Sequence, residues 1–294
     1  MSSALVTGST GFVGSHLVRR LAADGWHVAR LLRKDLESAT PVAGVRDHWW
    51  DGSTVAAVAA VAAVAPDVVF HLASLFVAEH GAADVAPLVE SNVLVGAQVA
   101  EAMLRTGCRL MVNTGTSWQR DAEGAYDPVC LYAATKQAFE DVLTYYVNAE
   151  DFAAITLRLY DTYGPEDRRP KLVSALRGAV LSGAPLSLSP GEQLLDLVHV
   201  DDVTAAFALA GLRLLDGGAG HECFDVSSGR ARTLRAVVAA FAAAAGRPVP
   251  VRWGERPYRR REVMTPLEGR PLPGWRAEIS LEEGFERLVV RGDT

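Results

Sequence analysis

The sequence is poor in cysteine, with only three in 294 residues, and their positions show no regular spacing. Cys108, Cys130 and Cys223 therefore do not form the pattern of a disulfide framework, and their scarcity favours a reducing compartment. The cluster His221-Glu222-Cys223 has too few ligands for a zinc site, so we expect it to begin a strand. The sequence predicts neither a disulfide nor a bound metal.

Positive charge is also scarce, because 29 Lys and Arg face 35 Asp and Glu, which gives a net charge of −6. With a pI of about 5.7, this balance argues against a nucleic-acid surface. The longest Ala/Val run, from Val55 to Ala65, is too short to span a bilayer. No basic segment followed by a cleavable apolar one opens the chain. We expect a cytoplasmic protein with no nucleic-acid or membrane partner.

Apolar residues make up 49% of the chain, enough to fill a sizeable core at this length. Up to residue 165, apolar runs alternate regularly with helical patterns, which predicts a parallel sheet with right-handed crossovers. Beyond that point the elements become short and mixed. We therefore expect an α/β fold with a doubly wound parallel sheet in residues 1–165 and a smaller mixed domain in residues 166–294. Parts of 200–228 are expected to return to the sheet.

The periodicity also predicts the individual elements. Strands are expected at 4–7, 26–32, 68–74, 109–113, 154–160, 186–188, 194–200, 222–226 and 249–253. Helices are expected at 16–23, 55–65, 84–105, 131–149, 171–182, 201–215, 233–245 and 281–288, the one at 201–215 capped by Asp201 and Asp202.

A glycine-rich segment, Gly8-Ser9-Thr10-Gly11-Phe12-Val13-Gly14, lies between the first predicted strand and helix. In this context the first glycine permits a tight turn, the second lets backbone approach a pyrophosphate, and the third allows close helix packing. The helix N-terminus then offers free N–H groups to phosphates. A glycine-rich turn in any α/β protein is the alternative, but the flanking strand and helix favour a dinucleotide. The residues expected to contact it here are Gly8, Thr10, Gly11, Phe12, Val13 and Gly14.

The end of the second predicted strand bears on the choice of cofactor. An NAD-preferring site usually carries Asp or Glu there, for the ribose 2′-hydroxyl. Here the strand ends in Leu32-Arg33-Lys34. Arg33 and Lys34 suit a 2′-phosphate, which favours NADP(H), with NAD(H) as the alternative; they could also be solvated surface charges. Asp51, followed by Gly52, is placed to accept from the adenine amino group, although Asp-Gly is equally typical of a turn.

Catalytic chemistry is indicated by Tyr132 and Lys136, which share one face of a predicted helix. A lysine ammonium beside a phenol favours the phenolate and lowers its pKa, giving a proton donor and acceptor usable at cellular pH. Thr116, at the end of a central strand, is our candidate for the third group, polarising a carbonyl by hydrogen bonding. Spacing alone leaves Thr114 and Ser117 open as the hydroxyl that points inward. His71 is expected to be a packed strand-end residue rather than a catalyst.

The motifs Thr7-Gly8-x-x-Gly11-x-x-Gly14, a strand-end Thr116 and Tyr132-x-x-x-Lys136, in this order, resemble those of the extended short-chain dehydrogenase/reductases. Within them the chain is similar to the NAD(P)-dependent sugar epimerase/dehydratase family. The likeness covers essentially the whole chain, since matches also occur at Leu159-x-x-x-Tyr163-Gly164-Pro165, at His199-Val200-Asp201-Asp202-Val203 and at Gly274-Trp275 with Ser280 to Gly284. A narrower likeness, in residues 113–118, 131–140 and 161–165, is to abequose-synthase-type reductases of nucleotide-linked 4-keto-6-deoxyhexoses.

The resemblance implies a Rossmann-type sheet with a substrate-binding domain, and a role for each matching residue. Tyr132 is the acid/base, Lys136 lowers its pKa and binds the nicotinamide ribose, and Thr116 orients the carbonyl. Further implied cofactor contacts are Leu72, Ala73, Ser74, Asn92, Thr114 and Tyr160. Implied substrate contacts are Ser74, Thr116, Ser117, Trp118, Asp161, Thr162, Lys171 and Arg259. Relatives commonly dimerise through the helices expected here at 84–105 and 131–149, so a homodimer is expected.

Departures from the family pattern narrow the reaction. Sugar dehydratases carry Asp-Glu after the strand-end hydroxyl, whereas this chain has Ser117 and Trp118, so dehydration is not expected. Many relatives hold the substrate diphosphate with an Arg near position 195. This chain has Leu195 there, which cannot make that contact. Arg259 stands where another diphosphate-binding Arg is usual, and charge-assisted pairing to phosphate suits it, although Arg259 to Arg261 could equally form a solvated face.

Three functions follow from these residues. The first is an NADPH-dependent ketoreductase acting on the 4-keto group of a dTDP- or CDP-linked 4-keto-6-deoxyhexose. The second is a nucleotide-sugar 4-epimerase with tightly held NAD, which an acidic residue at position 32 would have favoured. The third is a non-catalytic nucleotide-sensing relative, against which the intact Thr116, Tyr132 and Lys136 argue.

Overall fold

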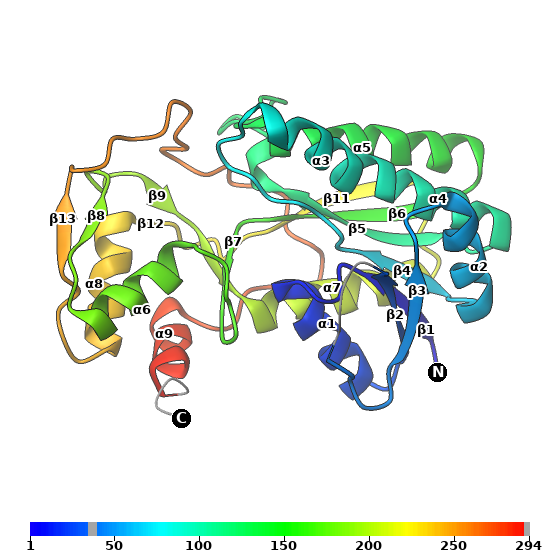
Figure 1. The fold of residues 1–294 in the computed structure, drawn as a ribbon, viewed down its shortest axis with the longest axis horizontal. Helices are drawn as coiled ribbons and strands as arrows, with labels where there is room; N and C mark the ends of the chain where they lie inside the picture. Colours follow the sequence, from blue (N-terminus) through cyan, green and yellow to red (C-terminus); the bar gives the residue numbers. More distant parts are fainter. Residues whose placement is uncertain (35–39, 291–294) are drawn as a thin grey trace.

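The computed structural model describes residues 1–34 and 40–290 and shows a seven-stranded parallel sheet with a smaller lobe beside it (Figure 1). The sheet has the order β11-β6-β5-β4-β1-β2-β3, which confirms the predicted α/β class. Its strands are β1 Ser3–Thr7, β2 His27–Arg33, β3 Arg46–Trp50, β4 Val68–His71, β5 Leu110–Thr116, β6 Ala153–Leu159 and β11 His221–Val226. The order reverses between β1 and β4, and a crevice at the carboxyl ends of such strands is where doubly wound sheets bind ligands.

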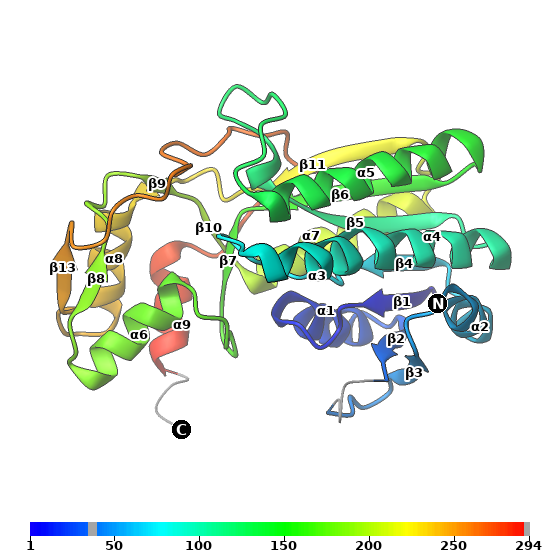
Figure 2. The ribbon, with the colours of Figure 1, turned by 45° about the horizontal axis from the view of Figure 1, so that its top comes forward.

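Helices cover both faces of the sheet (Figure 2). They are α1 Phe12–Ala23, α2 Thr54–Val64, α3 Val85–Val89, α4 Val95–Thr106, α5 Leu131–Ala149 and α7 Val200–Leu215. Leu17 of α1 and Phe207 of α7 belong to one buried cluster, while Val99 of α4 and Phe139 of α5 belong to the other. Because apolar side chains leave both faces of the inner strands, strands such as β1, β4 and β6 are buried on both sides, whereas the edge strand β3 is partly exposed.

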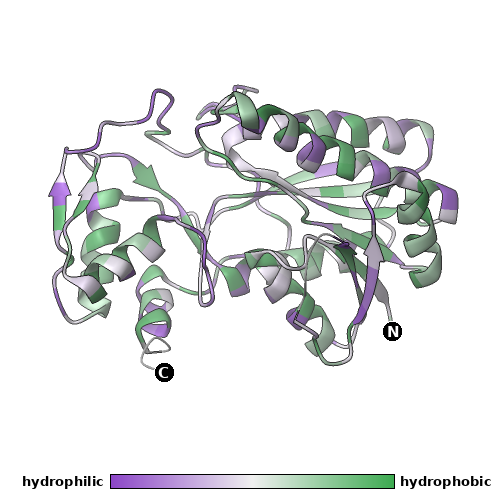
Figure 3. Ribbon diagram, in the orientation of Figure 1, coloured by the Kyte–Doolittle hydropathy of each residue, from purple (hydrophilic) through white to green (hydrophobic). Residues whose placement is uncertain are grey.

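Local sequence explains where the helices begin and end. Helix α2 consists almost wholly of alanine and valine and is apolar along its length (Figure 3). It begins where the Ser53 hydroxyl accepts a hydrogen bond from the Ala56 N–H, and it ends at Ala65, whose φ of 46° is left-handed. Helix α4 ends at Gly107 with a φ of 85°, as the Thr106-Gly107 pair predicts.

The smaller lobe is built around its own core, which includes Tyr163, Leu176, Val237, Phe241 and Phe285. Its helices are α6 Leu172–Ser182, α8 Leu234–Ala244 and α9 Leu281–Val290. Its strands form three short pairs: β7 Asp161–Tyr163 with β10 Leu197–His199, β9 Leu194–Leu195 with β12 Arg232–Thr233, and β8 Leu186–Leu188 with β13 Val251–Trp253. Between these pairs the chain returns to the large sheet, because α7 packs on it and β11 pairs with β6.

Several element boundaries differ from the prediction. Helix α1 begins at Phe12 rather than His16, because the helix starts directly at the glycine loop. The expected single helix at 84–105 is interrupted by a π-helical segment, Glu90–Leu94. The strand expected at 194–200 is two strands, with Asp196 between them bound to the Ser227 hydroxyl and the Ser228 N–H. The cap of α7 is the His199 side chain, which accepts from the Asp201 N–H.

Two strands of the large sheet also end elsewhere than predicted. Strand β5 continues to Thr116 because it stays paired with β6 up to Leu159. Strand β4 ends at His71 instead of Ser74. Among the described helices, none is both long enough and apolar enough to cross a bilayer.

Candidate active site

The loop at the end of β1 leaves no room for a side chain at Gly8 or at Gly14. Gly8 has a φ of 66°, and a Cβ there would lie 2.5 Å from the backbone of Leu72 and Ala73. A Cβ on Gly14 would lie 2.2 Å from the Gly8 carbonyl oxygen. Gly11 is the extended residue before α1, with no side chain to cap the helix. The first N–H groups of α1 therefore face the crevice, which is the arrangement that binds a pyrophosphate.

A cavity of about 220 Å³ lies over this loop and reaches the end of β5. Most residues expected to bind the cofactor or its reacting end line it: Gly8, Gly11, Phe12, Val13, Gly14, Leu72, Ser74, Thr114, Thr116, Tyr132 and Tyr160. Thr10 lies exposed on the loop, and the Ala73 N–H donates to the Thr7 hydroxyl behind it. The crevice thus brings the glycine loop together with the predicted catalytic residues Thr116 and Tyr132.

The predicted adenosine contacts lie apart from this cavity, at the ends of β2 and β3. Arg33 and Lys34 are exposed there, and the Lys34 N–H donates to the Trp50 carbonyl. Hydrogen bonding from the Ser53 side chain, and next from the Ser53 N–H, lowers the pKa of the Asp51 carboxyl. Gly52 has a φ of 88°. Asp51 and Gly52 therefore form the turn that the sequence left open, while the Asp51 carboxylate remains exposed beside two cations.

Three hydroxyl side chains, Thr114, Thr116 and Ser117, lie at the end of β5, and the structure distinguishes the first two by their hydrogen bonds. The Thr114 hydroxyl donates to the His71 carbonyl over 2.8 Å, so it ties β5 to β4. Thr116 ends the strand, lines the cavity, and accepts from the Trp118 N–H over 3.3 Å, which leaves its hydroxyl proton available to donate. Ser117 also lines the cavity, in a 3-10 turn at Ser117–Gln119. Thr116 is thus a strand-held hydroxyl with a free proton.

Tyr132 and Lys136 both project from the inner face of α5 and are buried, at 9% and 1% exposure. Burial raises the pKa of Tyr132 to about 12, opposed by an interaction with Ser74 and by the charge of Arg169. Burial also lowers the pKa of Lys136 to about 8, opposed by the charge of Glu140. The net shift of the Tyr132 pKa is therefore upward, which contradicts the net lowering expected from the sequence, because desolvation outweighs the charges near the phenol.

Lys136 and its neighbour His71 are buried without full pairing. Within the described part of the chain, neither the Lys136 Nζ nor the His71 Nε2 has a hydrogen-bond partner. His71 Nδ1 lies 3.0 Å from the Thr7 hydroxyl, and burial holds the pKa of His71 at about 3, so this ring is neutral. An unpartnered buried ammonium and a glycine cradle that a Cβ would fill are what a site for a dinucleotide requires, so these residues fit a nicotinamide cofactor.

Asn92 was expected to contact the cofactor, but its side chain is fully buried and completely used within the protein. Its oxygen accepts from the Ser74 hydroxyl and the Leu75 N–H. Its nitrogen donates to the Leu75 carbonyl and the Thr135 hydroxyl. This corrects the prediction, because no group of Asn92 is left for a ligand. Asn92 instead fastens the Ser74 loop to α5, the helix that carries Tyr132.

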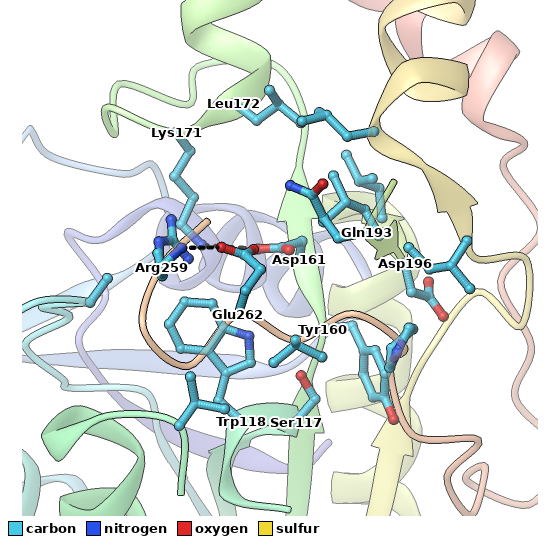
Figure 4. A pocket seen from close by; sticks show the side chains of 18 of the residues that line it. Ser117, Trp118, Tyr160, Asp161, Lys171, Leu172, Gln193, Asp196, Arg259 and Glu262 are labelled. Atoms are coloured by element: carbon cyan, nitrogen blue, oxygen red, sulfur yellow. Dashed lines mark hydrogen bonds and ion pairs between the residues drawn. The ribbon is translucent and has the colours of Figure 1, made fainter. Parts of the chain in front are cut away.

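A larger cavity of about 730 Å³ opens from the same crevice toward the smaller lobe (Figure 4). Most predicted substrate residues line it: Ser117, Trp118, Asp161, Thr162, Lys171 and Arg259. Lys171 and Arg259 point toward one another, and the Lys171 Nζ lies 3.5 Å from an Asp161 oxygen (Figure 4). Arg259 also lies 5.5 Å from the centre of the Trp118 ring. The cavity therefore offers both cationic and aromatic contacts.

The basic block at 259–261 divides in the structure. Arg259 and Arg261 line the larger cavity, and Arg261 is paired with Asp127. Arg260 is exposed. Leu195, at the position where many relatives have an arginine, lines the cavity as well. Arg259 and Lys171 thus line this cavity as cations, while residue 195 is apolar.

Sequence reasoning missed two residues that the structure adds to the site. The Phe76 ring lies 5.0 Å from Tyr132 and 5.6 Å from Trp118, and the Lys171 Nζ lies 4.7 Å above it. Arg169 lines the smaller cavity, 4.4 Å above the Phe12 ring, with its guanidinium paired to Asp167. Their only signal in the sequence is position, since Phe76 follows Ser74 by two residues and Arg169 precedes Lys171 by two.

The chain is similar to known proteins over most of its length. The sequence matches the model of the NAD dependent epimerase/dehydratase family over residues 4–223. It is 29% identical to a UDP-glucose 4-epimerase of Mycolicibacterium smegmatis, covering 97% of this chain and 96% of that protein. It is 23% identical to a CDP-abequose synthase of Salmonella muenchen, with 97% and 96% covered.

Among solved structures, the fold is similar to a UDP-glucose 4-epimerase of Thermus thermophilus in complex with NAD. The TM-score is 0.84 at 27% identity, and 99% of this chain and 100% of that chain are covered. The family match spans the glycine loop, the end of β5 and the Tyr132–Lys136 helix, which together form the crevice described above. The chain belongs to the NAD-dependent epimerase/dehydratase family of extended short-chain dehydrogenase/reductases and is an NAD(P)-dependent enzyme.

Proposed function

We propose that the protein is an NADPH-dependent ketoreductase acting on the 4-keto group of a nucleotide-activated (dTDP- or CDP-) 4-keto-6-deoxyhexose. The observation that carries this proposal is the placement of Thr116 and Tyr132 at one cavity, with no dehydratase carboxylates after Thr116. Tyr132 lies at the cavity with a pKa raised to about 12, so at neutral pH it is a phenol able to give a proton. Ser117 and Trp118 beside it cannot perform the acid/base work of a dehydratase.

The chain's own groups fit the two requirements of carbonyl reduction. NADPH, when bound, supplies the hydride. The Thr116 hydroxyl, whose proton is free, donates a hydrogen bond to the substrate carbonyl and polarises it. Tyr132 gives its proton to the same oxygen as negative charge develops there. Lys136, with a pKa of about 8, stays largely charged at neutral pH and favours the phenolate that remains after proton transfer.

The cofactor choice rests on the end of β2. Leu32 is buried at the strand end and cannot accept from a ribose hydroxyl, while Arg33 and Lys34 are exposed immediately after it. A 2′-phosphate there would gain charge-assisted hydrogen bonds from these cations. A reductase consumes its cofactor in every turnover, which suits the reduced NADPH pool.

Substrate binding is assigned to the larger cavity, between the dinucleotide-binding part and residues 166–294. Lys171 and Arg259 would hold the diphosphate, in place of the arginine that relatives carry near Leu195. Phe76 and Trp118 form an apolar wall next to Tyr132, which suits the methyl-bearing face of a 6-deoxyhexose. The relative named as a CDP-abequose synthase favours this substrate class.

A nucleotide-sugar 4-epimerase is the second candidate, because two of the similar proteins are UDP-glucose 4-epimerases and one of them is solved in complex with NAD. One assay separates the two. Purified protein is mixed with NADPH and a dTDP- or CDP-4-keto-6-deoxyhexose, and the absorbance of the reduced cofactor is followed. Stoichiometric loss supports reduction. Interconversion of sugars with no net loss, using UDP-glucose and NAD, would replace the proposal with epimerisation.

We also propose a cytoplasmic homodimer, paired through α3–α4 and α5 as the family resemblance implies. Apolar side chains are exposed on these helices and on the turn between α3 and α4: Val85, Val89, Leu94 and Tyr145, at 43%, 44%, 50% and 58%. Their burial between two copies would remove apolar surface from water. Sedimentation equilibrium measures the mass directly, and a monomer at micromolar concentration would refute the dimer.

A further inference from the structure

A buried chain of polar side chains lies directly behind Thr116. The Gln119 side-chain oxygen accepts from the Thr116 N–H over 2.8 Å. The Gln119 nitrogen donates to a Glu140 oxygen over 2.6 Å and to the Gln137 oxygen over 3.0 Å. The other Glu140 oxygen accepts from Arg158 over 2.9 Å. Gln119 is fully buried, and Glu140 and Arg158 are 3% and 7% exposed, so these bonds are shielded from water.

The order of these partners fixes the Gln119 amide in one orientation. Arg158 and Glu140 form a buried ion pair, so Glu140 is a carboxylate that accepts only. The Gln119 NH₂ must therefore face Glu140, and its oxygen must face Thr116.

The backbone next to Thr116 is shaped for this contact. A Cβ on Gly115 would lie 2.9 Å from the Gln119 oxygen, 3.0 Å from a Glu140 oxygen and 3.0 Å from the Arg158 side chain. Gly115 thus lets all three groups pass directly against the strand end. Glu140 also lies on α5 one turn beyond Lys136, which lies one turn beyond Tyr132, so the same helix face carries the acid and the network.

We propose that Gln119 is a positioning residue, held by the Glu140–Arg158 pair, which sets the end of β5 so that the Thr116 hydroxyl faces the substrate carbonyl. The proposal rests on the role given to Thr116 above, which reduction and epimerisation share. Gln119 acts on the backbone of Thr116, and the cofactor cavity is lined by other residues. Losing Gln119 should therefore impair the chemical step and leave cofactor binding intact.

The test compares Gln119→Leu with a matched control. Gln119→Leu removes the acceptor of the Thr116 N–H at similar volume. Thr156→Val is the control, because Thr156 is fully buried in β6 and bonded to Asn113 and His221, with no contact to Thr116. We expect kcat to fall about 10- to 100-fold in Gln119→Leu, since small misplacements of a catalytic group cost that much. The Kd for NADPH should stay within twofold, and Thr156→Val should lower Tm without lowering kcat.

Exchanging the amide and the carboxylate tests the Gln119–Glu140 hydrogen bond itself, so the proposal does not depend on one variant. In Gln119→Glu, two carboxylates face each other where the wild type has a 2.6 Å hydrogen bond, so kcat should fall. In the double variant Gln119→Glu/Glu140→Gln, the new glutamate still accepts from Thr116, and the new glutamine bridges it to Arg158. This pair should recover most of the wild-type kcat. Failure of the double variant to exceed Gln119→Glu would overturn the proposal, as would an unchanged kcat or a joint loss of NADPH binding in Gln119→Leu.

Hydrogen exchange at the Thr116 amide gives a readout that does not depend on turnover. We expect faster exchange in Gln119→Leu, wild-type exchange in Thr156→Val, and slow exchange restored in the swapped pair. Should the wild type show no turnover of either substrate class, the proposed function fails while this measurement still decides the positioning role. Unaltered exchange in Gln119→Leu would overturn it.

Discussion

Replacing Lys136 by methionine is expected to stabilise the protein without cofactor while abolishing its activity. Lys136 is 1% exposed, and within the described residues its ammonium has no hydrogen-bond partner. Methionine keeps the length of the side chain and removes the charge. Glu140 would keep Arg158 and Gln119 as partners, so the substitution leaves no carboxylate unpaired. The buried Lys136 ammonium thus lowers the stability of the fold, and we expect it to be kept for function.

The magnitude follows from the lowered pKa. Burial moves the pKa of Lys136 from 10.5 to about 8, and at about 1.4 kcal/mol per unit this shift corresponds to roughly 3 kcal/mol. The sign follows from linkage: below pH 8 the lysine is charged in both states, so the full cost is present at pH 7. The cost is relieved as pH rises from about 8 to 10.5, because the folded protein then releases the proton first.

Thermal unfolding at several pH values tests this reasoning. At pH 7, Lys136→Met should raise Tm by about 6 to 12 °C, given about 2 to 4 °C per kcal/mol for a chain of this size. The gap to the wild type should narrow between pH 8 and pH 10. Lys34→Met is the control, because Lys34 is exposed and its replacement should leave Tm nearly unchanged. A Lys136→Met variant less stable than the wild type at pH 7, or a gap independent of pH, would refute the argument.

Three further predictions concern the cofactor and the acid. Tyr132→Phe should abolish turnover while NADPH binding, measured by fluorescence titration, stays within twofold; retained turnover would contradict the role of the phenol. Arg33→Ala should weaken NADPH binding by about tenfold and NADH binding little, whereas equal losses would remove the basis for choosing NADPH. Gly14→Ala, whose Cβ would lie 2.2 Å from the Gly8 oxygen, should abolish binding of both cofactors, while Gly178→Ala, where a Cβ meets nothing within 4 Å, should not.

The large sheet was predictable because its signals are local and repeated. Apolar runs such as Val68 to His71 are buried on both faces, so they stand out without any alternation of polar residues. Helix α5, at Leu131–Ala149, was predicted with its observed bounds. The split between β9 and β10 was not predictable, since it depends on Asp196 reaching Ser227, 31 residues away. The π-helical segment at Glu90–Leu94 likewise carries no breaker residue in its sequence.

The candidate site was predictable where a motif places several residues at once. Gly8, Gly11 and Gly14 line the cavity with Tyr132, as their motifs indicate. Phe76 and Arg169 were missed because they lie in irregular segments whose path is set by packing. Asn92 was placed correctly near the site, but which of its neighbours would use its amide depends on the loop at Ser74 and Leu75.

The opposite pKa shifts of Tyr132 and Lys136 have one cause. Burial penalises the charged form of each group, so the phenol keeps its proton, while the ammonium loses its proton at a lower pH than usual and still stays largely charged at pH 7. Proton donation to a carbonyl oxygen starts from the phenol, the form that burial favours. A negative charge or a hydrogen-bond acceptor that a bound ligand brings to Lys136 will hold its proton more firmly and favour the phenolate left after donation. The desolvated helix face of α5 therefore holds Tyr132 as a phenol at neutral pH, the form that donates a proton.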